Sequence, residues 1–222
     1  MILPDFLFEK KLYKKGYKYI AGADEVGRGS FSGPVVAGCV VLKIGVLPGL
    51  TGSDSIIIND SKRLTPEKRE IADKWIRKNS VAWGIGTAGV AQINRLGIKK
   101  ASEIAFRKAI KNTGVEISYL LIDAFYIPYV RGLRRKNQKA VVKGDTRSIS
   151  IAAASIIAKV YRDNLMYRLG GRPKYKKYGW GRNKGYGTGQ HRDAIKKYGP
   201  TRQHRKQFVA TWLKNSSFSP VR

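Results

Sequence analysis

Runs of residues with the composition of β-strands alternate along the chain with longer stretches of helical pattern. Enrichment in β-branched and aromatic residues predicts five strands, at residues 17–23, 34–42, 80–88, 117–122 and 140–143. Helical spacing and capping residues predict five helices, at residues 66–79, 91–112, 148–169, 188–198 and 204–214. This order is typical of a mixed α/β sheet domain followed by a smaller helical C-terminal part, which we place at residues 1–169 and 170–222.

Local signals refine some of these elements. Thr65 before Pro66 is an N-cap followed by proline at the first helical position. Gly97 weakens the start of the helix predicted at 91–112. Residues 170–187 combine many glycines with interleaved Lys, Arg, Tyr and Trp residues. We therefore predict a loop there, whose aromatic and cationic side chains suit a nucleic-acid surface.

The charge balance adds a partner to this picture. The 222 residues hold 44 Lys and Arg against 15 Asp and Glu, a formal net charge of +29. Because such a surplus repels itself, a polyanionic partner is the economical explanation, and nucleic acid fits best since each neutralised phosphate releases counterions. A merely solubilising surface is the alternative, and an anionic membrane is disfavoured because no basic amphipathic helix stands out. Charge alone does not separate an RNA-binding structural protein from an enzyme that acts on nucleic acid.

The same composition excludes several protein classes. Apolar residues make up 42% of the chain, enough to build a core, which argues against wholesale disorder. No apolar run approaches the ~18 residues of a membrane helix, and residues 1–11 lack the features of a signal peptide. Cys39 is the single cysteine, which excludes an internal disulfide framework and a Cys-based zinc module. We expect a cytoplasmic, monomeric protein with no membrane partner.

Carboxylates are scarce, and four of them follow predicted strands. Asp24 and Glu25 come at the end of the first strand, Asp123 ends the fourth, and Asp145 follows the fifth. Strand ends of a mixed sheet can converge on one edge, where ligands commonly bind. Because like charges a few ångströms apart oppose ionisation, such a cluster calls for divalent cations, and oxygen ligands suit Mg²⁺ or Mn²⁺. Two such ions can flank a phosphodiester, as a nuclease requires.

A structural role for each acid is the alternative at this point. An acid after a strand is often a turn former or a helix cap, and Asp145 could cap the helix that follows it. Adjacent residues on a regular strand point to opposite faces, so Asp24 and Glu25 cannot both aim their side chains at one metal without a bend or bulge. His191 and His204 have no partner spacing for zinc, and a phosphate contact or helix-face packing suits both.

Sequence blocks spread through the chain carry a more specific signal. They lie at residues 21–29 (AGADEVGRG), 33–37 (GPVVA), 60–64 (DSKRL), 121–124 (LIDA), 143–145 (KGD), 150–163 (SIAAASIIAKVYRD), 185–188 (GYGT), 191 (H), 198–201 (YGPT) and 204–205 (HR). In this order, across roughly residues 17–208, they closely resemble the motifs of the bacterial ribonuclease HII family. The combination is highly specific, although the Asp-Glu-Val-Gly tetrapeptide alone would be weak.

The resemblance implies an RNase H-like α/β fold, with a mixed five-stranded sheet flanked by helices and a small helical C-terminal extension. It implies hydrolysis of the RNA strand of RNA–DNA hybrids and incision 5′ of ribonucleotides embedded in duplex DNA, leaving a 5′-phosphate and a 3′-hydroxyl. The catalytic, metal-binding acids carry over to Asp24, Glu25, Asp123 and Asp145, with two divalent ions, Mg²⁺ or Mn²⁺. Asp24 is then the central ligand, Asp123 and Asp145 flank it, and Glu25 contributes its main-chain carbonyl.

The resemblance also assigns contacts to the nucleic acid. Gly27-Arg28-Gly29 resembles the loop that senses the ribonucleotide, where glycines let backbone groups come within hydrogen-bonding distance of a 2′-hydroxyl. Tyr186 corresponds to the tyrosine that packs on the sugar at the RNA–DNA junction. Lys62 is a candidate phosphate contact, with a solvated lysine as the alternative.

Two other functions stay open beside this interpretation. A non-catalytic basic RNA-binding protein would explain the charge but not three strand-terminal acids. Another two-metal nuclease or recombinase of the same fold would share the acids but not need the 27–29 loop or Tyr186. Asp163 lies four residues after Lys159, which favours an i, i+4 pair over a supporting role at the site. The basic stretches 131–136 and 172–184 depart from the family pattern and bear on substrate affinity rather than chemistry.

Overall fold

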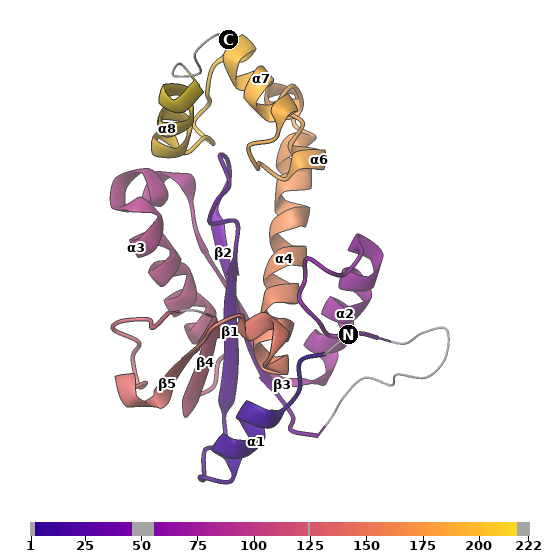
Figure 1. Cartoon of the computed structure of the whole chain (residues 1–222), viewed down its shortest axis with the longest axis vertical. Coiled ribbons are helices and arrows are strands. Elements are labelled where there is room, and N and C mark those ends of the chain that lie inside the picture. The colour runs from indigo at the N-terminus through magenta and orange to yellow at the C-terminus, as the bar shows by residue number, and fades with distance from the viewer. Residues whose placement is uncertain (1–2, 46–55, 124, 217–222) are drawn as a thin grey trace.

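The computed structural model describes residues 3–45, 56–123 and 125–216 of the chain. Within these ranges a five-stranded sheet has helices on both faces, and a group of short helices lies beyond one end of the sheet (Figure 1). The predicted α/β class and the mixed five-stranded sheet are confirmed. None of the helices in the described ranges is both long and apolar enough to cross a membrane.

The sheet combines antiparallel and parallel pairing. Its strands are β1 (Ile20–Val26), β2 (Val35–Leu42), β3 (Ser80–Ala88), β4 (Tyr119–Asp123) and β5 (Gln138–Val141). Their order is β3-β2-β1-β4-β5, in which β1 is antiparallel to β2 and parallel to β4, and β5 is parallel to β4. The first strand begins at Ile20 rather than at residue 17, and it continues past the predicted end because Val26 still pairs with Val36. The C-terminal ends of β1, β4 and β5 therefore meet at one edge of the sheet.

The helices agree closely with the predicted ranges in the longer elements. They are α1 (Leu7–Tyr13), α2 (Pro66–Asn79), α3 (Val90–Lys111), α4 (Ile149–Gly170), α5 (Pro173–Lys176), α6 (Trp180–Asn183), α7 (Gly189–Tyr198) and α8 (Lys206–Ser216). Thr65 caps α2 as predicted, since its hydroxyl accepts a hydrogen bond from the Lys68 amide at 3.3 Å. Gly97 has φ of +76° and kinks α3 near its start, where the sequence indicated weakness. Helix α1 was not predicted, because it is short and has no side-chain hydrogen bond at its N-cap.

The long helix α4 lies directly against the sheet and determines where the site forms. A side chain at Gly22 of β1 would come within 2.1 Å of the Ser150 carbonyl carbon, and one at Gly38 of β2 within 2.3 Å of the Ala154 carbonyl oxygen. The two glycines thus let the helix backbone approach both strands closely. The first half of α4 is buried, as its small, apolar sequence predicts, while α3 covers the opposite face of the sheet (Figure 1).

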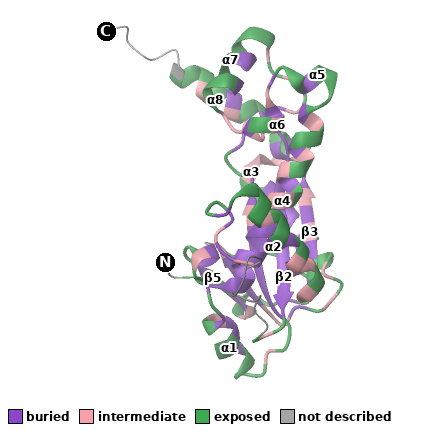
Figure 2. Ribbon diagram, turned by 90° about the vertical axis from the view of Figure 1, so that its right-hand side faces the viewer, coloured by how far each residue is buried: buried purple, intermediate pink, exposed green. Residues whose placement is uncertain are grey.

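The prediction for residues 170–187 is wrong in two respects. The segment is not a loop throughout, because it contains the short helices α5 and α6. Most of its aromatic side chains are not on a surface either, since Tyr175, Tyr178 and Trp180 are buried. They form a separate apolar cluster with residues of α7 and α8, visible as buried segments among the outlying helices in Figure 2. These rings therefore form a small core instead of the predicted surface, whereas the cations Lys174, Lys176 and Lys177 of the same segment are exposed.

Candidate active site

The four predicted acids come from three neighbouring strands. Asp24 and Glu25 lie in the last part of β1, Asp123 is the final residue of β4, and Asp145 lies in the short 3₁₀ helix Gly144–Thr146 that follows β5. Asp24, Glu25 and Asp123 line one cavity of about 270 Å³. Asp145 adjoins it, because the amide of the preceding residue, Gly144, donates a hydrogen bond to Asp123 Oδ1 at 2.8 Å. The parallel pairing of β1, β4 and β5 brings the carboxylates together.

Asp24 has the most perturbed carboxyl group of the cluster. It is 7% exposed and faces α4, where a hydrogen bond with the Ser155 side chain partly stabilises its charged form. Burial first, and then the charge of Glu25 and Asp123, raise the pKa of Asp24 to about 8. Its Oδ1 accepts a hydrogen bond from the Glu25 amide at 2.7 Å. A cation beside this buried carboxyl group would stabilise its charged form against both burial and the neighbouring carboxylates.

Glu25 shares the cavity with Asp24 despite following it directly in the strand. Its Oε1 lies 3.3 Å from Nη1 of Arg28 in an ion pair, and the side chain is largely buried. Burial raises the pKa of Glu25, and the Arg28 charge opposes that rise. The Glu25 carboxylate is therefore engaged by the next loop, which fits the expectation that its side chain is not a central ligand.

Asp145 does not cap α4. Ser148 performs that role, since its hydroxyl accepts a hydrogen bond from the Ile151 amide at 3.3 Å. Asp145 is instead 7% exposed, and its pKa is raised by burial and then by Asp60 and Asp123. The turn-former alternative accounts for neither the burial nor the carboxylate neighbours.

Lys62 is the cation that faces the acids. Its Nζ lies 4.0 Å from Asp145 Oδ2, while its side chain is 81% exposed on the other sides. Burial of its inner part would lower its pKa, but the charges of Asp60, Asp145, Asp24 and Asp123 produce a net rise. Lys62 is thus held at the mouth of the acidic cavity with its ammonium group open to a ligand.

The donor set fits divalent cations. Within residues 3–45, 56–123 and 125–216, no three acidic, His or Cys side chains are already gathered into a finished metal-binding set. Of the buried acids Asp24, Glu25 and Asp123, only Glu25 forms an ion pair in the described part of the chain, with Arg28, while Lys62 pairs with the adjoining Asp145. The carboxylate oxygens are the ligands that Mg²⁺ and Mn²⁺ prefer. Burial first, and then the neighbouring carboxylates, raise the pKa of Asp24, and such ions would stabilise its charged form.

The predicted substrate loop forms one wall of the cavity. Gly27 and Arg28 line it, together with Tyr186 from the segment before α7, whereas Gly29 is exposed next to it. Gly27 has φ of +89°, which favours glycine. A side chain at Gly29 would meet no atom within 4 Å. The open space is therefore beside Gly29, where a ligand could approach the backbone.

Sequence reasoning missed four side chains around this cavity. Ser61, Ser155 and Lys159 line it, and Phe125 packs under Arg28, whose guanidinium carbon is 5.2 Å from the ring centroid. The two serine hydroxyls lie 3.0 Å apart and join the 60–64 segment to α4. They fall inside the blocks at 60–64 and 150–163, so position within a motif was the available signal. Ala124, beside Phe125, lies outside the described residues.

The remaining candidates have structural partners. Asp163 pairs with Lys159 at 3.0 Å, as the i, i+4 spacing indicates. His191 and His204 are almost fully buried, with their Nε2 atoms 3.2 Å apart. Their burial excludes the phosphate contact considered for them, and packing within the C-terminal cluster is the observed role.

Comparisons with known proteins agree with this geometry. A protein-family model described as Ribonuclease HII matches residues 21–213. Ribonuclease HII of Caldanaerobacter subterraneus subsp. tengcongensis is 45% identical over 93% of this chain and 80% of its own. Ribonuclease HII of Wolbachia sp. subsp. Brugia malayi is also 45% identical, over 94% of this chain and 95% of its own.

Solved structures share the fold at lower sequence identity, and two of them document it. The ribonuclease H2 of Pyrococcus horikoshii OT3 is similar with a TM-score of 0.67 and 21% identity, over 91% of this chain and 100% of that one. Bst-RNase HIII in complex with Mn²⁺ is similar with a TM-score of 0.67 and 19% identity, over 90% and 71% of the two chains. Because the family model covers residues 21–213 and the relatives are 45% identical over nearly the whole chain, this protein belongs to the ribonuclease HII family.

Proposed function

We propose that this protein cleaves the RNA strand of RNA–DNA hybrids and incises 5′ of ribonucleotides embedded in duplex DNA. Membership of the ribonuclease HII family makes it a hydrolytic endoribonuclease. The observation that carries the proposal is the juxtaposition of the acidic cavity with the 27–29 loop and Tyr186. A nuclease that ignored sugar identity would need the acids but not this wall.

The acids are proposed to hold two divalent cations. Asp24 is the central ligand, Asp123 and Asp145 flank it, and Glu25 contributes a main-chain oxygen while its carboxylate pairs with Arg28. When bound, such ions activate water for attack on phosphorus and stabilise the leaving oxygen, yielding a 5′-phosphate and a 3′-hydroxyl. Mn²⁺ occupies one solved structure of the same fold, Bst-RNase HIII, which supports a divalent metal in this chain.

Cationic side chains at the cavity are proposed to receive the phosphate backbone. Lys62 presents its exposed ammonium group at the mouth, and Lys159 lines the interior on α4 while Asp163 fixes its Nζ at 3.0 Å. Because the protein as a whole carries a net charge of +29, approach of a polyanion is favourable over long range. The acids would repel the same phosphate without cations, so substrate and metal are expected to bind together.

The sugar is proposed to be read by backbone groups and one ring. Gly29 leaves open space beside the backbone, and Gly27 supplies the left-handed turn that shapes the loop. Tyr186 is partly exposed at the cavity wall, and its main-chain carbonyl accepts a hydrogen bond from His191 Nδ1 at 2.8 Å. A tyrosine ring held at the wall of the cavity can pack on the sugar next to the ribonucleotide, and it can thereby distinguish a duplex that contains a ribonucleotide from continuous DNA.

An incision assay tests the proposal. The substrate is a DNA duplex with a single ribonucleotide, incubated with Mg²⁺ or Mn²⁺, and the enzymes are wild type and Asp24→Asn. The matched control is Asp193→Asn, an equivalent change at an exposed position of α7. We expect wild type and the control to incise 5′ of the ribonucleotide and Asp24→Asn to do so hardly at all.

Each contrary result identifies a different error. Binding of the duplex without incision by wild type would favour a non-catalytic nucleic-acid-binding protein. Cleavage at positions unrelated to the ribonucleotide would favour another two-metal nuclease with this fold. Full activity of Asp24→Asn would remove the acid cluster from the mechanism.

A further inference from the structure

Two arginine side chains are buried between α4, the β1–β2 connection and the C-terminal segment. Arg162 of α4 and Arg205, just before α8, are both 0% exposed. Neither forms any of the ion pairs found in the described part of the chain. Burial lowers the pKa of both groups, for Arg205 to about 9. A buried guanidinium without a carboxylate is costly, so its hydrogen bonds decide what it contributes.

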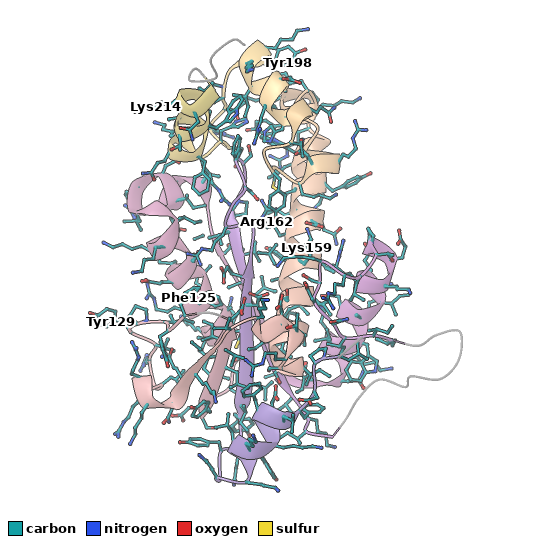
Figure 3. All side chains as sticks on the ribbon, viewed as in Figure 1. Phe125, Tyr129, Lys159, Arg162, Tyr198 and Lys214 are labelled. Atoms are coloured by element: carbon teal, nitrogen blue, oxygen red, sulfur yellow. The ribbon has the colours of Figure 1, made fainter. Side chains whose placement is uncertain are left out.

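Arg162 joins the β1–β2 connection to Lys184, about 150 residues later in the chain. Toward the β1–β2 connection it donates to the Pro34 carbonyl at 3.0 Å, the Ser32 carbonyl at 3.2 Å and the Ser30 hydroxyl at 2.9 Å. Toward the C-terminal segment it donates to the Lys184 carbonyl at 3.0 Å. Figure 3 shows Arg162 on α4 above Lys159, level with that connection.

The same guanidinium touches both groups that are proposed to recognise the ribonucleotide. Its carbon lies 5.3 Å from the ring centroid of Tyr186. It also occupies the place where a side chain at Gly27 would be, since a Cβ there would lie 2.1 Å from Arg162 Nε. The glycine at position 27 is therefore required by the buried arginine as well as by its positive φ.

Arg205 supports the tip of the same loop. Its Nη1 donates to the Arg28 carbonyl at 2.7 Å and its Nε to the Gly33 carbonyl at 3.0 Å. Backbone hydrogen bonds also join this connection to the C-terminal segment, but they involve residues 31–33: the Phe31 and Ser32 amides donate to Gly185, the Gly33 amide donates to Gln203, and the Phe31 carbonyl accepts from the Arg205 amide. Among the described hydrogen bonds, those of the two arginine side chains are the ones that tie the Arg28 carbonyl and the Ser30 hydroxyl, on the side of the 27–29 loop, to residues outside the β1–β2 connection.

We propose that Arg162, assisted by Arg205, is a positioning residue that holds the 27–29 loop and Tyr186 in one fixed arrangement and thereby sets the preference for an isolated ribonucleotide. The inference rests on the proposed function of the loop and Tyr186. It assigns the buried arginines no contact with the substrate. A continuous RNA–DNA hybrid offers a 2′-hydroxyl at every position and tolerates a loosened loop better than a single ribonucleotide does.

Arg162→Lys is the decisive variant. Lysine keeps the charge and most of the length but lacks the planar fork, so it cannot donate to Pro34, Ser30 and Lys184 at once. Ser30→Ala removes only one of the bonds and is a milder second variant whose folding is less at risk. Arg168→Lys is the matched control, because Arg168 is an exposed arginine on the same helix.

The assay compares kcat and KM on a duplex with one ribonucleotide and on a continuous RNA–DNA hybrid. For Arg162→Lys we expect kcat on the single ribonucleotide to fall on the order of tenfold relative to the hybrid, because small displacements of positioning groups reduce rates steeply. Ser30→Ala should change the ratio in the same direction by less, and Arg168→Lys should leave it unchanged. If Arg162 had a purely structural role, Arg162→Lys would lower kcat on both substrates by the same factor.

Hydrogen–deuterium exchange gives a readout that does not depend on activity. Arg162→Lys and Ser30→Ala should accelerate amide exchange at residues 27–33 and 184–187 while exchange in the sheet stays as in wild type. An unchanged substrate ratio in both variants would overturn the positioning role, whether or not exchange at these residues becomes faster. If wild type cuts neither substrate but exchange responds as expected, the proposed function fails and the structural part of the inference stands.

Discussion

Lowering the pH should destabilise this protein through His204. Its ring lies in the C-terminal cluster with Tyr178 and Trp180, 4.9 Å and 5.5 Å away between ring centroids, and it is 1% exposed. The hydrogen-bond pattern assigns its tautomer, because Nδ1 accepts from the Thr201 amide at 2.8 Å and Nε2 faces His191 Nε2 at 3.2 Å. His191 Nε2 already accepts from the Trp180 indole at 3.0 Å, so the proton between the two rings belongs to His204. A second proton on His204 would disrupt this chain.

The size of the effect follows from the shifted pKa. Burial, and then the neighbouring His191, lower the pKa of His204 from 6.5 to about 4. Because the folded pKa lies below the unfolded one, the contribution of neutral His204 is fully present above pH 6.5 and is lost as pH falls toward about 4. At about pH 5 the linkage relation gives a loss of about 2 kcal/mol relative to neutral pH. His191 has its pKa lowered as well, mainly by burial, and acts in the same direction.

Urea denaturation at about pH 7.5 and about pH 5, at fixed ionic strength, measures this loss. Carboxylates titrate over the same interval, so the comparison is between wild type and His204→Asn, whose side-chain oxygen can still accept from the Thr201 amide. The variant starts from a lower free energy of unfolding, but its decrease between the two pH values should be smaller by about 2 kcal/mol. Equal decreases in the two proteins would refute the reasoning. Protonation of His204 should also loosen Tyr186, because the Tyr186 carbonyl accepts a hydrogen bond from His191, the neighbour of His204.

Three further predictions concern the site and its surface. Tyr186→Ala should slow incision at a lone ribonucleotide while leaving the far-ultraviolet circular dichroism spectrum intact, and an unchanged single-turnover rate would remove its assignment. Gly27→Ala should lower the free energy of unfolding by more than about 1 kcal/mol, because residue 27 has a positive φ and its Cβ would overlap Arg162. Gly29→Ala should preserve stability and impair incision, because its Cβ would occupy the open space beside the loop. Urea denaturation and the incision assay test the two variants. Duplex affinity should fall steeply as salt rises, given the net charge of +29, and a flat response in a salt titration would contradict a phosphate-dominated interface.

Much of the architecture is encoded locally and could be predicted. The helix that starts after Thr65 and the strand Ser80–Ala88 occupy the predicted residues, because a cap, a proline and a β-rich run act within a few positions. The same holds for α4, whose small apolar start predicts its burial against the sheet. Local signals failed for residues 170–187, where composition does not reveal whether Tyr175 and Trp180 face inward or outward.

The candidate site was predictable in its members but not in its arrangement. Periodicity and scarcity singled out Asp24, Asp123 and Asp145, and the motif blocks added Lys62 and Tyr186. Strand alternation argued against Asp24 and Glu25 sharing a site, yet both line the cavity, with Glu25 drawn toward Arg28 of the following loop. The direction of the Glu25 side chain depends on its ion pair with Arg28, three residues later in the chain. A rule based on strand alternation does not include such a pair.

The sequence by itself determined the class of fold and the places of the acids at strand ends, and its total charge favoured a polyanionic partner, because these inferences need only local spacing and composition. Only the tertiary structure decided that Arg162 fills the space left by Gly27, that the histidines are internal, and that Lys62 faces Asp24, Asp123 and Asp145. Those facts depend on contacts between segments far apart in the chain. Parallel strand pairing and the close approach of α4 create such contacts, and no stretch of the sequence contains them on its own.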